Sequence, residues 1–114
     1  MDWLELTQII EHHLGMYVGR ATYERAVALL RGFDLAQGTS LWPELQKRVE
    51  ARHQTGSRGW PQVLLAEALG ADVRDAPDLG PLTREQNKAA IACLCRELRS
   101  CLDPDARHDG MPEA

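Results

Sequence analysis

Aromatic residues are scarce in this chain. They make up 5% of its 114 residues, and Phe33 is its single phenylalanine. No segment shows the sustained alternation of apolar and polar residues that is typical of a half-buried strand. A core built from aromatic and β-branched strands is therefore not expected. The apolar residues, 44% of the chain, are mainly alanine, leucine and valine, which favours an all-α fold of closely packed helices.

Long apolar runs and a basic leader are also missing. No run approaches the roughly 18–20 residues that a membrane span needs, so no membrane association is expected. The first residues, MDWLELTQIIEHHLG, carry acids through their apolar stretch, which is not the pattern of a signal peptide. The few cysteines are clustered, which suits a reducing compartment better than a disulfide framework (Cys93, Cys95 and Cys101). We therefore expect a cytoplasmic protein.

Neither sign of charge forms a block. The net charge is −4, and acids and bases are interleaved along the chain. Nucleic acids and anionic membranes are bound largely through basic faces, so we expect neither as a partner. The acidic balance fits a basic protein partner. It also suffices to keep a small protein in solution, which is the interpretation we favour.

Motifs for catalysis, metals and cofactors are missing as well. The glycines form neither a P-loop nor a G-x-G-x-x-G, and no serine lies in a G-x-S-x-G turn. His12 and His13 are neighbours and would point about 100° apart on a helix, so they cannot hold one metal together. Cys93 and Cys95 would project to nearly opposite sides of a helix, and the chain has no second cysteine pair. We expect no enzyme activity, no metal and no cofactor.

What the chain does contain is a series of helix start and stop signals. Asp2 with Glu5, and Thr83 with Gln86, form capping boxes, and Thr22 is a third N-cap. Prolines suited to a first helical turn and glycines suited to a helix end mark further boundaries: Pro43, Pro61, Gly15, Gly38 and Gly70. Helices are therefore expected over residues 2–14, 22–37, 42–52, 60–70 and 83–102.

These segments predict a compact single-domain bundle of about five helices over residues 1–104, followed by a flexible polar tail over residues 105–114. The third helix should turn its cations outward (Lys47, Arg48 and Arg52). In the last helix, Cys95 and Cys101 fall on the apolar stripe and fit the core. Cys93 lies off that stripe and is the thiol that we expect to be most reactive.

Two segments contain unusual residue patterns that a simple helical bundle does not need. In GMYVGRATYER, residues 15–25, two glycines bracket an apolar Met-Tyr-Val, and Arg20 follows. We favour a tight interhelical turn whose apolar residues cap the core over a binding loop. In SRGWPQ, residues 57–62, Trp60 is either a core anchor, which we favour, or an interface residue. Trp, Tyr and Arg are the residue types enriched at binding hot spots.

The GMYVG segment resembles the R-P-G-M-Y-I-G stretch near the start of type II topoisomerase ATPase domains. The likeness covers about six residues. That family's Asn/Glu helix and D-x-G-x-G nucleotide loop are missing from this chain, which is also much shorter. An ATPase is therefore excluded.

A likeness over nearly the whole chain is to small helical bacterial immunity-type proteins, which neutralise toxins encoded beside them. It is carried by MYVG at 16–19, LLRGFDLA at 29–36, RGWPQVLLAEAL at 58–69 and the amphipathic segment at 83–102. His13-Leu14 departs from the Arg-Pro that such relatives tend to have at this point. The resemblance implies an all-α protein that binds a protein toxin tightly.

The leading hypothesis is therefore an immunity-type binding protein. Its candidate contact residues are large or charged side chains in the two specific segments and acids after the fourth helix: Tyr17, Arg20, Tyr23, Trp60, Asp72, Asp75 and Asp78. The acids could meet a basic cleft, such as that of a nuclease-like toxin. One alternative is a helical adaptor or homo-oligomeric regulatory module. Another is a binder of small anions through GMYVGR, because a glycine-flanked turn with an arginine can hold an anion.

Overall fold

The computed structural model describes residues 2–53, 58–75 and 78–102, and within these ranges its regular structure is entirely helical. The predicted all-α class is confirmed. Five helices are substantial, as expected, and a five-residue helix, α2, is added to them. The elements in chain order are α1 (Trp3–His12), α2 (Leu14–Val18), α3 (Tyr23–Gln37), α4 (Leu41–Arg52), α5 (Trp60–Leu69), the 3-10 turn η1 (Val73–Asp75) and α6 (Arg84–Leu102).

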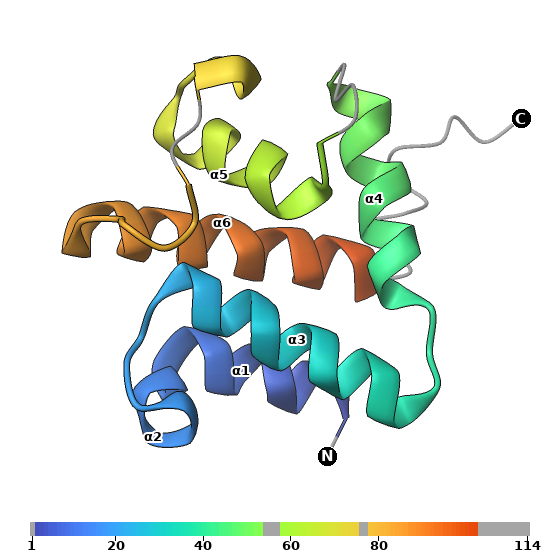
Figure 1. Cartoon of the computed structure of the whole chain (residues 1–114). Coiled ribbons are helices and arrows are strands. Elements are labelled where there is room, and N and C mark those ends of the chain that lie inside the picture. Colours follow the sequence, from blue (N-terminus) through green and yellow to red (C-terminus); the bar gives the residue numbers. More distant parts are fainter. Residues whose placement is uncertain (1, 54–57, 76–77, 103–114) are drawn as a thin grey trace, which may run out of the picture.

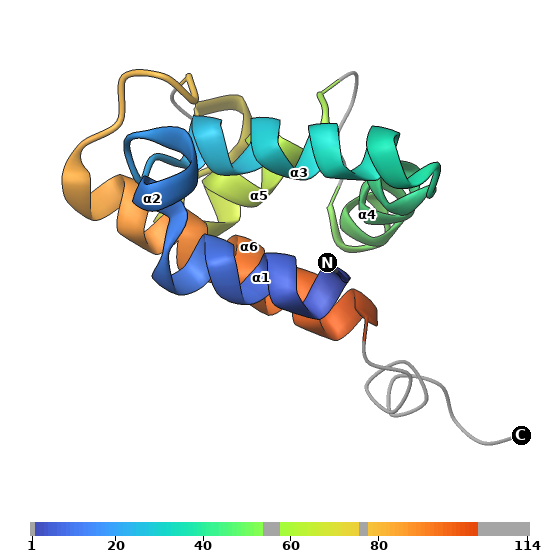
Figure 2. The same cartoon turned by 90° about the horizontal axis from the view of Figure 1, so that it is seen from below.

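The last helix, α6, lies at the centre of the bundle. Figure 1 shows it running between α5 on one side and α1 with α3 on the other, and Figure 2 shows the same arrangement turned by 90°. The thiol of Cys93 points to the backbone of α5, and that of Cys95 points to the backbone of α1. Because other helices cover α6 on opposite sides, it buries residues well beyond a single apolar stripe.

The three predicted helix starts that rest on capping residues are confirmed by the hydrogen bonds of those residues. The Glu5 amide donates to Asp2 Oδ1 at 2.8 Å, and the Arg25 amide donates to the Thr22 hydroxyl at 3.2 Å. The capping box of α6 is reciprocal, because the amides of Thr83 and Gln86 each donate to the other side chain. Glycines in the left-handed region end α3 and α5, as predicted (Gly38, φ 65°, and Gly70, φ 66°).

The start of α4 is capped from the preceding helix. The carboxylate of Asp34, at the end of α3, accepts hydrogen bonds from the Leu41 amide at 3.0 Å and the Trp42 amide at 3.1 Å, and also from the Thr39 hydroxyl. Burial opposes the charged form of Asp34, but these hydrogen bonds outweigh burial and lower its pKa. The Asp34 side chain therefore fixes the angle between α3 and α4.

The first predicted boundary is wrong. We expect Gly15 to end a helix over residues 2–14, but α1 ends at His12 and α2 continues through Gly15 to Val18. His13, with φ −133° and ψ 19°, breaks the helix between them. The left-handed glycine here is Gly19, with φ 84°, so Gly19 supplies the stop that the sequence assigned to Gly15.

Among the described residues, no helix combines the length and the apolar character that crossing a membrane demands. The tail predicted over residues 105–114 lies outside the described residues.

Candidate functional site

The predicted contact residues Tyr17 and Arg20 lie on the surface. Tyr17, in α2, is 58% exposed, and its neighbour Met16 is 83% exposed. Arg20, directly after the left-handed Gly19, is also exposed. The favoured interpretation, in which Met-Tyr-Val caps the core, is correct only for Val18, which packs against the buried cluster. The short helix α2 therefore presents two large apolar side chains to solvent.

Tyr23 and Trp60 are not surface residues, which corrects their assignment as partner contacts. Both are fully buried. The Tyr23 hydroxyl donates to the Pro61 carbonyl at 2.7 Å, and burial raises the pKa of this phenol, so it stays a donor. The Trp60 ring packs edge-on against Trp42 at 4.8 Å between centroids, as expected of the core anchor that we favour. Neither ring can reach a partner while the bundle is folded.

The three aspartates are exposed and lie outside α2. Asp72 directly precedes the 3-10 turn η1, Asp75 is its last residue, and Asp78 lies in the segment that leads back to α6. In Figure 1, η1 lies at the top of the view and α2 at the bottom. The Asp72 carboxylate is engaged locally by the Arg74 amide at 2.9 Å, and this bond lowers its pKa. The predicted contacts therefore do not form one patch.

A groove of about 400 Å³ lies where the end of α1, the start of α2 and the first half of α6 meet. Its floor consists of Ile10, Leu14 and Ile91, which are buried. Its rim is exposed and combines small residues with charged ones: Glu11, His12, Gly15, Ala21, Arg84, Lys88 and Ala92. Leu14 and Gly15 belong to α2, the short helix that also carries the exposed Met16 and Tyr17.

Long-range contacts hold the segment after α2 in place. The Asn87 side chain, in α6, accepts from the Tyr23 amide at 2.8 Å and donates to the Thr83 carbonyl at 3.1 Å. The Arg25 guanidinium donates to the Val18 carbonyl at the end of α2. A Cβ at Gly19 would lie 2.9 Å from this guanidinium, so both φ and space favour glycine there. The surface formed by α2 and the groove is therefore ordered without a partner.

The two sides of the groove differ in charge. On the α1 side, Glu11 forms a bidentate pair with Arg99, at 2.6 and 2.7 Å, and contacts His12 at 2.9 Å. The pair with Arg99 lowers the pKa of Glu11. On the α6 side, neither Arg84 nor Lys88 forms an ion pair with any residue that the structure describes. The groove therefore offers its cations to an incoming group.

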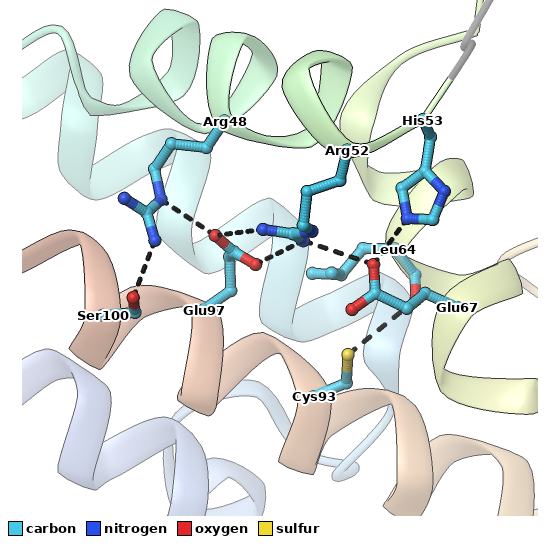
Figure 3. A network of polar contacts seen from close by, with 8 residues as sticks. All are labelled: Arg48, Arg52, His53, Leu64, Glu67, Cys93, Glu97 and Ser100. Atoms are coloured by element: carbon cyan, nitrogen blue, oxygen red, sulfur yellow. Dashed lines mark hydrogen bonds and ion pairs between the residues drawn. The ribbon is translucent and has the colours of Figure 1, made fainter. Parts of the chain in front are cut away.

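A second polar cluster joins α4 to α5 and α6 (Figure 3). Arg48 and Arg52 do not simply point outward as predicted, because both donate to Glu97, which is 7% exposed. The Arg48 Nε lies 2.9 Å from Glu97 Oε2, and the Arg52 Nη2 lies 2.6 Å from Glu97 Oε1. Arg48 also donates to Ser100, and Glu67 accepts from Arg52 and contacts His53. These cations hold helices together.

The expectation of a reactive Cys93 is not supported by its surroundings. Cys93 is 5% exposed, and its Sγ lies 4.0 Å from the Leu64 carbonyl oxygen (Figure 3). Burial raises the pKa of this thiol, and it also raises the pKa of Cys95 to about 11. A buried thiol with a raised pKa carries little thiolate and reacts slowly. The prediction for Cys93 was wrong because other helices cover α6 on more than one side, so residues off its apolar stripe are buried as well.

We expect all three cysteines to resist alkylation in the folded protein. Iodoacetamide near neutral pH should modify them on the order of a hundredfold more slowly than in urea, because the buried thiols are protonated and inaccessible. Intact-mass measurements over time test this, with the urea-unfolded chain as the control. Rapid addition of one adduct at Cys93 to folded protein would contradict it.

The structure gives limited support to the other chemistries. Three amides around the GMYVGR turn, those of Met16, Gly19 and Thr22, donate to backbone carbonyls two to four residues earlier in the chain, so these amides do not form a nest for an anion. In the part of the chain that is described, no group of three or more histidine, cysteine or acidic side chains is arranged to hold a metal.

Sequence reasoning missed most of the groove. Ile10, Leu14 and Ile91 lie in segments that the sequence predicts as helices, but nothing in the sequence marked them as the floor of a depression. The available signal was the spacing of Arg84, Lys88 and Ile91, which places two cations and an apolar residue on one face of α6. Comparison of this chain with models of protein families, with curated proteins and with solved structures finds no match.

Proposed function

We propose that this chain is an immunity-type binding protein of the cytoplasm that neutralises a bacterial toxin by tight association. The observation that carries the proposal is the surface formed by α2 and the adjoining groove. There Met16 and Tyr17 expose 83% and 58% of their area on a short helix that is ordered without a partner.

This surface has the features of a protein-binding hot spot. Binding energy concentrates at a few large side chains, among which tyrosine and arginine are enriched. Tyr17 and Arg20 are such residues, and they lie on either side of the restricted Gly19 turn. A surface that is already ordered loses little conformational entropy on association, and this favours tight binding.

One observation favours the homo-oligomeric alternative. Leu4 and Leu35 are 59% and 69% exposed. They flank the contact between Trp3 and Phe33, whose ring centroids lie 4.7 Å apart where the start of α1 meets the end of α3. Exposed apolar side chains of this kind could join two copies of the chain. This region is separate from the α2 surface, so variants can distinguish the two functions.

Alanine at Tyr17 or Arg20 should cost about 2 kcal/mol of binding free energy, roughly thirtyfold in affinity, because each removes an anchor. The melting temperature should hardly change, since both side chains are exposed. Co-purification from the producing cell with mass spectrometry would identify the partner, and calorimetry would then measure the affinity. A toxicity rescue assay, with partner and chain expressed together, tests neutralisation.

Leu35→Ala is the matched control, because it removes an exposed leucine at the other end of α3. It should leave partner affinity unchanged. If the chain is instead an oligomeric adaptor, Leu35→Ala would dissociate the oligomer in light scattering, and no toxin would co-purify. Unchanged affinity in a stable Arg20→Ala variant would remove the Gly19 turn from the interface.

A further inference from the structure

We infer that the groove beside α2 receives one amphipathic helix of the partner, with its apolar face on the floor and acidic side chains against Arg84 and Lys88. This rests on the proposed function and adds the chemistry of the partner segment. It also reverses the expected charge pattern, in which the aspartates of this chain meet a basic cleft.

The length of the groove matches a helix. Its α6 residues lie at positions 84, 88, 91 and 92, so the first and last are eight residue steps apart. At a rise of about 1.5 Å per residue, this stripe is about 12 Å long. A helix that binds through anchors at i, i+3 or i+4, and i+7 presents about 10.5 Å of apolar face. Two turns of partner helix therefore fill the groove.

The shape of the groove admits a helix backbone. Its floor is apolar, from Ile10, Leu14 and Ile91, and its edges include the small residues Gly15 and Ala92. A Cβ built on Gly15 would meet no atom within 4 Å, so the space above it is open. Small residues at an edge allow two helices to approach closely while larger anchors reach the floor.

The cations at the rim of the groove favour an acidic partner helix. Arg84 and Lys88 are exposed and are not paired with other described residues, whereas Glu11 opposite them is engaged by Arg99. Arg84 is also the first residue of α6, where a cation opposes the helix dipole. Arg84 therefore does not stabilise its own helix, and an incoming carboxylate would relieve this repulsion. Glutamates or aspartates on one flank of the bound helix complement this side.

A displayed peptide library tests the inference with defined probes. Each peptide carries leucine at i, i+3, i+4 and i+7, and its flanking positions vary among Glu, Gln and Lys. Selection against the full chain should enrich Glu on one flank. The selected peptides should bind Arg84→Glu/Lys88→Glu at least about tenfold more weakly. The matched control, Lys47→Glu/Arg74→Glu, makes the same change of charge at exposed sites on α4 and η1 and should bind as the unmodified chain does.

A steric variant separates the groove from general electrostatics. Ala92→Trp adds bulk at an exposed rim position and should abolish peptide binding without lowering the melting temperature. Four results would overturn the inference: an empty selection, enrichment of lysine, binding that survives Ala92→Trp, or a dimeric chain that Ala92→Trp makes monomeric. If these occur while a toxin still binds through Tyr17, the proposed function stands alone. If no toxin is found but acidic helices bind the groove, the immunity role fails.

Discussion

Tyr23→Ala should lower the free energy of unfolding by about 3–5 kcal/mol, the range for removing a fully buried aromatic side chain. Tyr23 is 0% exposed, at the junction of α3, α5 and α6. The substitution leaves a cavity in the core and removes the hydroxyl donor of the Pro61 carbonyl. In a domain of this size such a loss is a large part of the total stability.

Urea unfolding at neutral pH measures this effect, and Tyr23→Phe divides it into parts. Phenylalanine keeps the ring and loses only the hydrogen bond to Pro61, so it should cost about 1 kcal/mol. Tyr17→Ala is the matched control and should change stability by less than about 0.5 kcal/mol, because its side chain is 58% exposed. Equal losses at positions 17 and 23 would contradict the assignment of one tyrosine to the surface and the other to the core.

Local chemistry explains which parts of the fold were predictable. Helix starts follow from interactions within one turn, such as Asp2 with the Glu5 amide and Thr83 with Gln86, and these pairs formed as expected. Helix ends at Gly38 and Gly70 follow from the left-handed conformation that glycine adopts at little cost. Such signals need no knowledge of the rest of the fold, so the sequence was sufficient to place five helices.

The errors arise where residues far away in the sequence determine the local structure. Nothing near Gly15 in the sequence shows that the chain stays helical past it, because the later stop at Gly19 is tied to Arg25, and Asn87 holds the next helix. Likewise, Arg48 and Arg52 look like solvated cations until α6 brings Glu97 to them across 45 or more residues. Periodicity reports which face of a helix is polar. It does not report what covers that face.

The candidate site was predictable only in part. The glycine bracket around Met-Tyr-Val marked Tyr17 and Arg20, and both are exposed. The same reasoning also selected Tyr23, because large aromatic side chains also fill buried helix junctions, as Tyr23 and Trp60 do in this chain. The groove could not be read from the sequence, since it is formed by α1, α2 and α6 together.

Glu97→Gln should destabilise the protein by about 3 kcal/mol at neutral pH, which is the low end for breaking a buried ion pair. Glutamine keeps the shape of the side chain but removes the charge that pairs with Arg48 and Arg52. The cost stays low in that range because both guanidinium groups retain contact with water. The matched control is Glu67→Gln. Glu67 also pairs with Arg52 but is 36% exposed, so its loss should cost under about 1 kcal/mol.

The pH dependence of this difference identifies the carboxylate as its source. Burial alone would raise the pKa of Glu97, but hydrogen bonds from Arg52 and Arg48 outweigh it and lower the pKa below the ordinary value of 4.5. A group whose pKa is lower in the folded state stabilises the protein above its unfolded pKa and loses that contribution as the pH falls through the folded value. The gap in unfolding free energy between the unmodified protein and Glu97→Gln should therefore be full at neutral pH and shrink below about pH 4.5. Asp34 and Glu11 also have lowered pKa values, but both proteins contain them, so their effects cancel in the difference. Urea unfolding of both proteins at neutral pH and near pH 3 measures the gap, and a gap that stays constant would show that shape, and not charge, joins α4 to α6.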